Sequence, residues 1–118
     1  MKQIELEKKL ANFLRRRRKS NGVPYGKRYV KDKISRLRRV ASFVPMTALT
    51  NVNEGNYIYL IELVIEHFKN REYRSGEFRQ INCGDYLVVI RLLYEMNNKG
   101  KKAKRYMSYR GVIHEARQ

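Results

Sequence analysis

The excess of positive charge in this chain lies at its two ends, so the nearly neutral middle is the part that can build an apolar core. Residues 1–39 carry fifteen Lys and Arg against three acids, a net +12, and residues 99–118 carry seven against one, a net +6. Residues 40–98 carry five against seven, a net −2. A surface that serves solubility mixes both signs, whereas a field of one sign attracts polyanions. We therefore expect nucleic acid as the partner, with an acidic protein or an anionic membrane surface as the alternatives.

The remaining composition narrows the class of protein. A chain of 118 residues with 42% apolar residues is long enough for one domain, or one domain with a tail. A single cysteine, Cys83, excludes an internal disulfide and a cysteine-based zinc finger, and it fits a reducing compartment. The sequence has no apolar run of the ~18 residues that a membrane span needs, and its first residues lack the apolar region of a signal peptide. We expect a cytoplasmic protein that does not bind membranes.

Apolar residues at spacings of three and four predict four helices, over residues 4–18, 27–44, 57–70 and 83–97. Residues 47–55 are rich in Thr, Asn and Gly and predict a loop, with Asn53 or Asn56 capping the next helix. The β-branched residues of 57–68 also suit a strand, but the length of the segment favours a helix. Residues 112–113 are the other place where β structure is compatible with the sequence.

We therefore expect a mostly α fold, a four-helix bundle of two helical hairpins whose middle pair supplies most of the core. Residues 1–98 would form the helical nucleic-acid-binding domain, and residues 99–118 a basic C-terminal arm that becomes ordered on DNA.

Three clusters of cations are the candidate binding residues. The first, at the end of the first predicted helix, has five consecutive cations, more than the negative end of a helix dipole needs. The second lies beside the apolar stripe of the second predicted helix. The third is in the C-terminal arm, where Tyr106 and Tyr109 would be able to stack on bases. The predicted nucleic-acid-binding residues are Arg15, Arg16, Arg17, Arg18, Lys19, Lys27, Arg28, Lys31, Arg36, Arg38, Arg39, Lys101, Lys102, Lys104 and Arg105.

Most of these cations would contact phosphates, which fix the position of a protein on DNA but carry no sequence information. Arg36 and Arg39, three residues apart on the second predicted helix, are the candidates for contacting base edges.

Residues suited to catalysis or metal binding are poorly represented. His67 follows Glu66 in an apolar segment, which is typical of a core histidine, and His114 and Arg117 have a His-x-x-Arg spacing close to the end of the sequence. The sequence has no glycine-rich phosphate loop, no His/Cys metal spacing and no paired acids in a polar setting. We expect a non-enzymatic protein with no catalytic residues, no metal and no cofactor.

Four short segments resemble a known family. Residues 4–7 read IELE, residues 13–17 FLRRR, residues 20–22 SNG and residues 29–40 YVKDKISRLRRV. This pattern is similar to the N-terminal SAM-like, core-binding domain of phage-type tyrosine recombinases (integrases). Those domains pair a helix ending in FLxxR with a second helix carrying Y…(I/V)SRLRR, and a further helical hairpin follows.

The resemblance implies a stand-alone, four-helix DNA clamp of a phage or mobile element, with Arg16, Lys31, Arg36 and Arg39 among its backbone or groove contacts. In the family, the catalytic Arg, Lys, His and Tyr lie in a downstream domain that this sequence does not contain. The resemblance is therefore compatible with a fragment of an integrase or with a free-standing relative that binds DNA without cutting it.

We expect a non-enzymatic nucleic-acid-binding protein, with duplex DNA favoured over RNA. The alternative from a different class is a phage-encoded inhibitor or interaction protein that uses its basic face against a host nuclease or nucleoprotein complex. A third possibility is an RNA- or ribosome-associated basic protein, although no aromatic RNA-binding strand is evident.

Overall fold

A computed structural model describes residues 1–69, 83–99 and 101 of the chain. Over these residues the protein is mostly helical, as predicted, with five helices and no strand. The helices are α1 (Gln3–Arg16), α2 (Lys27–Ala41), α3 (Met46–Leu49), α4 (Tyr57–Lys69) and α5 (Cys83–Asn97).

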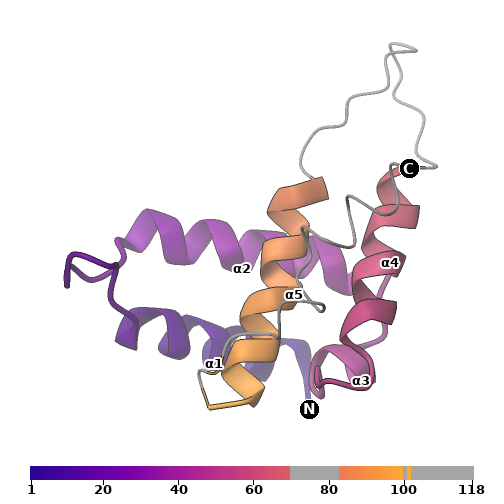
Figure 1. Ribbon diagram of the computed structural model, residues 1–118, viewed down its shortest axis with the longest axis horizontal. Helices are drawn as coiled ribbons and strands as arrows, with labels where there is room; N and C mark the ends of the chain where they lie inside the picture. Colours follow the sequence, from indigo (N-terminus) through magenta and orange to yellow (C-terminus); the bar gives the residue numbers. More distant parts are fainter. Residues whose placement is uncertain (70–82, 100, 102–118) are drawn as a thin grey trace, which may run out of the picture.

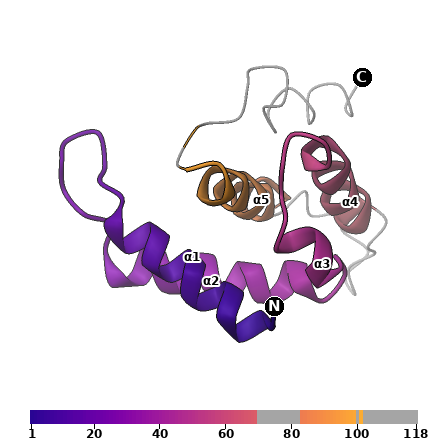
Figure 2. The same cartoon turned by 90° about the horizontal axis from the view of Figure 1, so that it is seen from below.

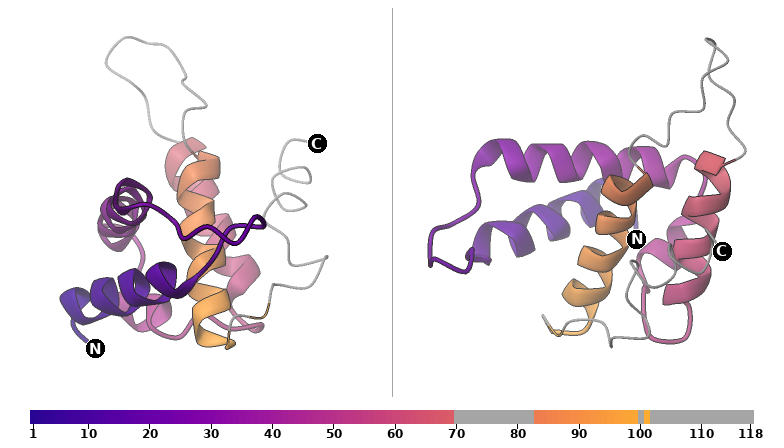
Figure 3. Two further views of the ribbon diagram at one scale, coloured as in Figure 1. Left: turned by 90° about the vertical axis from the view of Figure 1, so that its left-hand side faces the viewer. Right: turned by 45° about the horizontal axis from the view of Figure 1, so that its top comes forward.

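The helices form two layers. α1 and α2 run antiparallel as a hairpin in one layer, with the short α3 after them, and α5 and α4 form the other (Figures 1 and 2). α5 packs against α1, α2 and α4, so it lies between the hairpin and α4. Figure 3 shows that α5 crosses the hairpin at a steep angle instead of lying along it.

The core follows the apolar spacing of the sequence. On α1, Leu6, Leu10 and Leu14 recur every four residues and are almost fully buried, since residues four apart lie on one face of a helix. The apolar runs of α4 and α5 supply the other side of the core. Its fully buried members there include Leu60, Ile61, Val64, Leu87, Ile90 and Leu93.

Helix ends differ from the predicted ones where the backbone leaves the helical conformation. α1 ends at Arg16 because Arg17 is extended, with φ −76° and ψ 150°. α2 ends at Ala41, three residues before the predicted end, because the N–H groups of Ser42 and Phe43 donate to carbonyls three residues back. Such bonds tighten a last helical turn. Residues 57–69 are helical and not a strand, and α5 has the bounds that the sequence predicted.

The prediction of a loop over residues 47–55 was wrong in its first part, because α3 spans Met46–Leu49. The carbonyl of Pro45 accepts hydrogen bonds from Ala48 and Leu49, and the fully buried Leu49 side chain anchors the turn. The prediction of a simple four-helix bundle missed this fifth helix.

The two asparagines that were predicted as caps of the third long helix bond to each other in the turn before α4. Asn53 Oδ1 accepts a hydrogen bond from the backbone N–H of Asn56 at 3.2 Å, and Asn56 Oδ1 accepts one from the N–H of Asn53 at 2.9 Å. The two side chains thus fix the turn that leads into α4.

Part of the predicted interface lies outside the described residues. This part contains the arm residues Lys102, Lys104, Arg105, Tyr106 and Tyr109. Two other sequence features also lie outside the described residues, namely residues 112–113 and the His114/Arg117 pair. Lys101 is described and is exposed.

Candidate nucleic-acid interface

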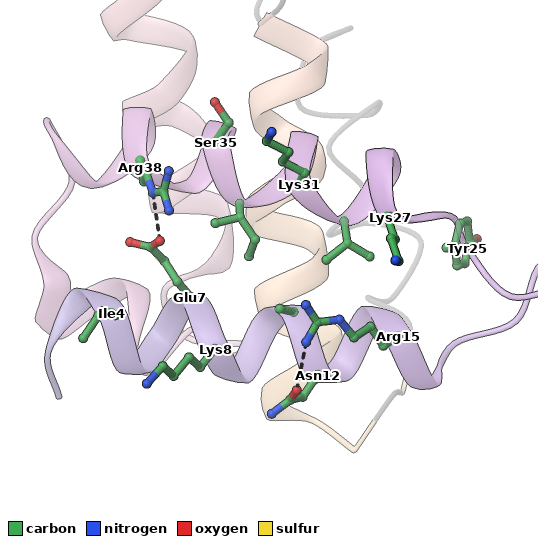
Figure 4. A pocket seen from close by; sticks show the side chains of 13 residues that line it. Ile4, Glu7, Lys8, Asn12, Arg15, Tyr25, Lys27, Lys31, Ser35 and Arg38 are labelled. Atoms are coloured by element: carbon green, nitrogen blue, oxygen red, sulfur yellow. Dashed lines mark hydrogen bonds and ion pairs between the residues drawn. The ribbon is translucent and has the colours of Figure 1, made fainter.

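A groove of about 1040 Å³ runs between α1 and α2, on the face of the hairpin turned away from α5 (Figure 4). Both helices contribute side chains to it, and Tyr25 closes one end. Its lining residues are Ile4, Glu7, Lys8, Ala11, Asn12, Arg15, Tyr25, Lys27, Val30, Lys31, Ile34, Ser35 and Arg38.

The charge of this groove is unbalanced, with five cations and one acid. Glu7 is engaged by Arg38, whose Nε donates to Glu7 Oε1 at 2.8 Å, and this pair bridges the two helices (Figure 4). The other four cations are exposed and make no ion pair with any residue that the structure describes; they are Lys8, Arg15, Lys27 and Lys31.

The floor of the groove is apolar. Ala11 and Val30 are buried and Ile34 is half-buried beneath the cations. A low-dielectric floor focuses the field of charges above it, and helices hold those charges at fixed spacing. Asn12 and Ser35 add short polar side chains of the kind that contact phosphate and sugar.

A shallower hollow of about 630 Å³ extends the cationic surface over α2. It is lined by Arg28, Tyr29, Lys31, Asp32 and Ser35, and it shares Lys31 and Ser35 with the groove. The exposed cations of α2 therefore form one continuous surface.

The first predicted cluster, Arg15–Lys19, does not act as one unit. Arg15 lines the groove and Arg16 is exposed at the end of α1, while Arg18 and Lys19 are exposed in the connection to α2. Arg17 turns toward the core, because the chain becomes extended at that residue.

Arg17 forms an ion pair with α5. Its Nη1 donates to Glu95 Oε2 at 2.5 Å, and Glu95 is only 2% exposed. Arg91 Nε lies 4.0 Å from the other oxygen of the same carboxylate, and the Arg17 guanidinium lies 5.4 Å from the centroid of the Phe13 ring. Arg17, predicted to bind nucleic acid, lies in the contact between α1 and α5.

Arg36 is engaged in a similar way between α2 and α5. Its Nε donates to Asp32 at 3.0 Å, its Nη1 lies 3.4 Å from Asp85, and its guanidinium lies 5.6 Å from the centre of the Tyr86 ring. The hydrogen bond from Arg36 lowers the pKa of Asp32 below its ordinary value. Arg39, the second candidate for base contact, is half-buried and lines neither the groove nor the hollow.

Two cations that are not among the predicted binding residues have opposite positions in the structure. Lys8 lines the groove, and its spacing of four and seven from Asn12 and Arg15 places all three on one helix face. Lys33 is buried, with its Nζ 5.0 Å from the centre of the Tyr29 ring and 3.6 Å from Asp32. Its burial was predictable from the sequence, because Lys33 follows Val30 by three residues and precedes Leu37 by four, and both are buried.

Burial, helped by the neighbouring Tyr25, raises the pKa of Tyr29. The two tyrosine rings stack at 4.4 Å, and the Lys19 ammonium lies 6.0 Å from the Tyr25 ring centre. These rings therefore cover one another at the end of the hairpin.

The described residues hold no group of three or more His, Cys, Asp and Glu side chains able to bind a metal ion. His67 stacks on Phe43 at 3.7 Å, so it takes part in packing. Within the same residues, the helices are all too short or too polar to cross a membrane. Comparison with protein-family models, curated protein sequences and solved structures finds no match for this chain.

Proposed function

We propose that this protein binds nucleic acid, with duplex DNA as its preferred partner, through the face of the α1–α2 hairpin turned away from α5. The observation that carries the proposal is the groove between α1 and α2, where four exposed cations face solvent without an acidic partner among the described residues. Phosphates are the natural counter-charge for such a surface. We propose no catalytic step.

Rigid presentation of the cations supports a duplex over a single strand. The proposed phosphate contacts lie on two packed helices, which fix their spacing, as a regular double helix requires; they are Lys8, Arg15, Arg16, Lys27, Arg28 and Lys31. Single strands are bound largely by aromatic rings that stack on bases. Here the rings of Tyr25 and Tyr29 stack on each other and are half-buried.

Arg17 and Arg36 are left out of the proposed interface because acids of α5 already engage them. Arg18 and Lys19 are exposed in the connection between the two helices and remain compatible with it, whereas Lys101 is exposed but follows α5, in the other layer (Figure 2). Arg38 is exposed but already paired with Glu7, so it is only partly available to a ligand.

We further propose that the chain is a stand-alone relative of the core-binding domain of phage-type tyrosine recombinases, from a phage or mobile element. Two features support this, namely the residues shared with that domain in 4–40 and the pairing of α1 with α2 and α4 with α5. In this proposal the chain clamps DNA and leaves any strand cleavage to another protein.

The test is a fluorescence anisotropy titration of the full chain against duplex DNA, single-stranded DNA and RNA at several salt concentrations. Six neutralised phosphates on B-DNA give a slope of log K against log salt of about −5. Tighter binding to the duplex with such a slope supports the proposal. Equal, weak binding to all three that is lost on adding salt contradicts it, and stable co-purification with a protein after nuclease treatment favours an inhibitor of a nucleoprotein complex.

A further inference from the structure

The connection between α1 and α2 ends in a projecting loop. Residues 18–24, which we call the tip loop, extend beyond the ends of both helices (Figure 2), and all seven are exposed. The loop carries Arg18 and Lys19 and no acid, and its one large apolar side chain, Val23, is 49% exposed.

Backbone hydrogen bonds hold the tip loop in a defined shape. The N–H of Lys19 donates to the carbonyl of Val23 at 2.9 Å, and the N–H of Gly22 donates to the carbonyl of Lys19 at 2.8 Å. Arg18 and Pro24 form an isolated β-bridge at the base of the loop. Gly22 has a φ of +82°, a conformation that glycine adopts without strain.

The side chain of Asn21 offers hydrogen-bond donors at the apex. Its Oδ1 accepts a hydrogen bond from the N–H of Val23 at 3.1 Å, which identifies the oxygen and the nitrogen of the amide. The two N–H donors of that amide make no hydrogen bond with any described residue. They make Asn21 a side chain that donates at the apex, while the Lys19 ammonium lies further back, 6.0 Å from the centre of the Tyr25 ring.

The minor groove of A·T base pairs is complementary to such an apex. A·T pairs present only acceptors there, adenine N3 and thymine O2, whereas G·C pairs add the donor amino group of guanine. The minor groove is about 6 Å wide, too narrow for a helix but open to single side chains. Proteins that bind this groove use Lys, Arg and Asn side chains together with apolar ones, which Val23 and Pro24 supply here.

We propose that side chains at the apex of the tip loop enter the minor groove of A·T-rich duplex DNA, next to the phosphates that α1 and α2 contact. Asn21 donates to the acceptors on the floor of that groove, Val23 packs against its sugar walls, and Lys19, nearer the base of the loop, contacts a phosphate at its edge. This inference rests on the proposed function, since it assigns the sequence preference of the same DNA-binding face.

The experiment uses three duplexes of equal length whose central tract contains A·T, G·C or inosine·C pairs. Inosine lacks the amino group of guanine, so inosine·C has the minor groove of A·T and the major groove of G·C. We expect the full chain to bind the A·T and inosine·C duplexes alike, and roughly tenfold more tightly than the G·C duplex. Equal affinity for all three overturns the inference but leaves duplex binding intact, whereas no duplex binding at all overturns the proposed function.

The Asn21→Asp variant tests the residue itself. The carboxylate retains an acceptor for the N–H of Val23 but replaces the two donors, so the preference for A·T and inosine·C should be lost. Asn12→Asp is the matched control, because it adds the same charge to the groove of the same hairpin, and it should weaken binding to all three duplexes alike while the preference remains. Circular dichroism of both variants checks that the helices are retained, and a preference that survives Asn21→Asp overturns the assignment.

Discussion

The two faces of the α1–α2 hairpin carry cations in opposite circumstances. On the face toward α5, Arg17 pairs with Glu95 and Arg36 with Asp85. On the groove face, Lys27 and three other cations have no acidic partner among the described residues. The comparison shows that the net charge of a basic segment does not identify its binding residues, because acids distant in sequence neutralise some of its cations.

Acids of α5 decide this division. Glu95 is buried and Asp85 is half-buried, and both lie on α5, which packs against both arms of the hairpin. A buried carboxylate needs a cation close by, since burial of an unpaired charge is costly. The inner cations therefore belong to the fold, and the outer ones are available to a ligand.

The largest expected effect tests the inner face. Glu95→Gln removes the buried carboxylate charge that pairs with Arg17, and we expect a loss of about 3 kcal/mol in the free energy of unfolding, measured by urea denaturation. Glu7→Gln makes the same chemical change on the groove face, where Arg38 is 62% exposed although the Glu7 side chain is only 12% exposed. The exposed partner weakens the pair, so we expect a smaller loss, of about 1 kcal/mol. Equal losses in the two variants would break the distinction between the faces.

A smaller effect tests the conformation of the tip loop, which connects α1 to α2. Gly22→Ala should lower the free energy of unfolding by about 1 kcal/mol, because an L-residue is strained at a positive φ. Gly26→Ala is the control, since an added Cβ meets nothing within 4 Å at either glycine and only Gly22 has a positive φ. The control should cost about 0.5 kcal/mol, because Gly26 is the N-cap of α2, a position that glycine fills better than alanine. A Gly22→Ala protein as stable as the control would show that the loop is not held in this conformation.

The apolar spacing of the sequence was sufficient to predict four of the five helices, since Leu6, Leu10 and Leu14 or the apolar runs of α4 and α5 need only local periodicity. α3 was not predicted, because its four residues are too few to show a helical period. The division of the cations was not predictable in the same way. It depends on where Glu95 and Asp85 lie in space, and this follows from the crossing of α5 over the hairpin and not from any local pattern. Lys33 is the exception, because its position between buried residues was visible in the sequence.

The smallest expected effect is the pH dependence of the stability that the Asp32–Arg36 pair contributes. The pKa of Asp32 is lowered in the folded protein from its ordinary 3.8, so the ionised form stabilises the fold above that pH, and this contribution is lost as pH falls through the lowered value. Asp32 is 44% exposed, so we expect about 0.5 kcal/mol or less. Urea denaturation of the wild-type protein and of Asp32→Asn should show a gap near neutral pH that closes below pH 3.8. A gap that widens on acidification would contradict the ionised pair with Arg36.

The salt dependence of duplex binding in Lys31→Gln and Arg36→Gln tests the distinction between the faces most directly. The two residues lie on α2 and the two variants remove the same charge, but Lys31 is exposed in the groove and Arg36 lies against α5. We predict that Lys31→Gln reduces the magnitude of the slope of log K against log salt by about 1, whereas Arg36→Gln leaves it unchanged. Equal reductions, or a reduction in Arg36→Gln alone, would contradict the assignment of the groove face to nucleic acid.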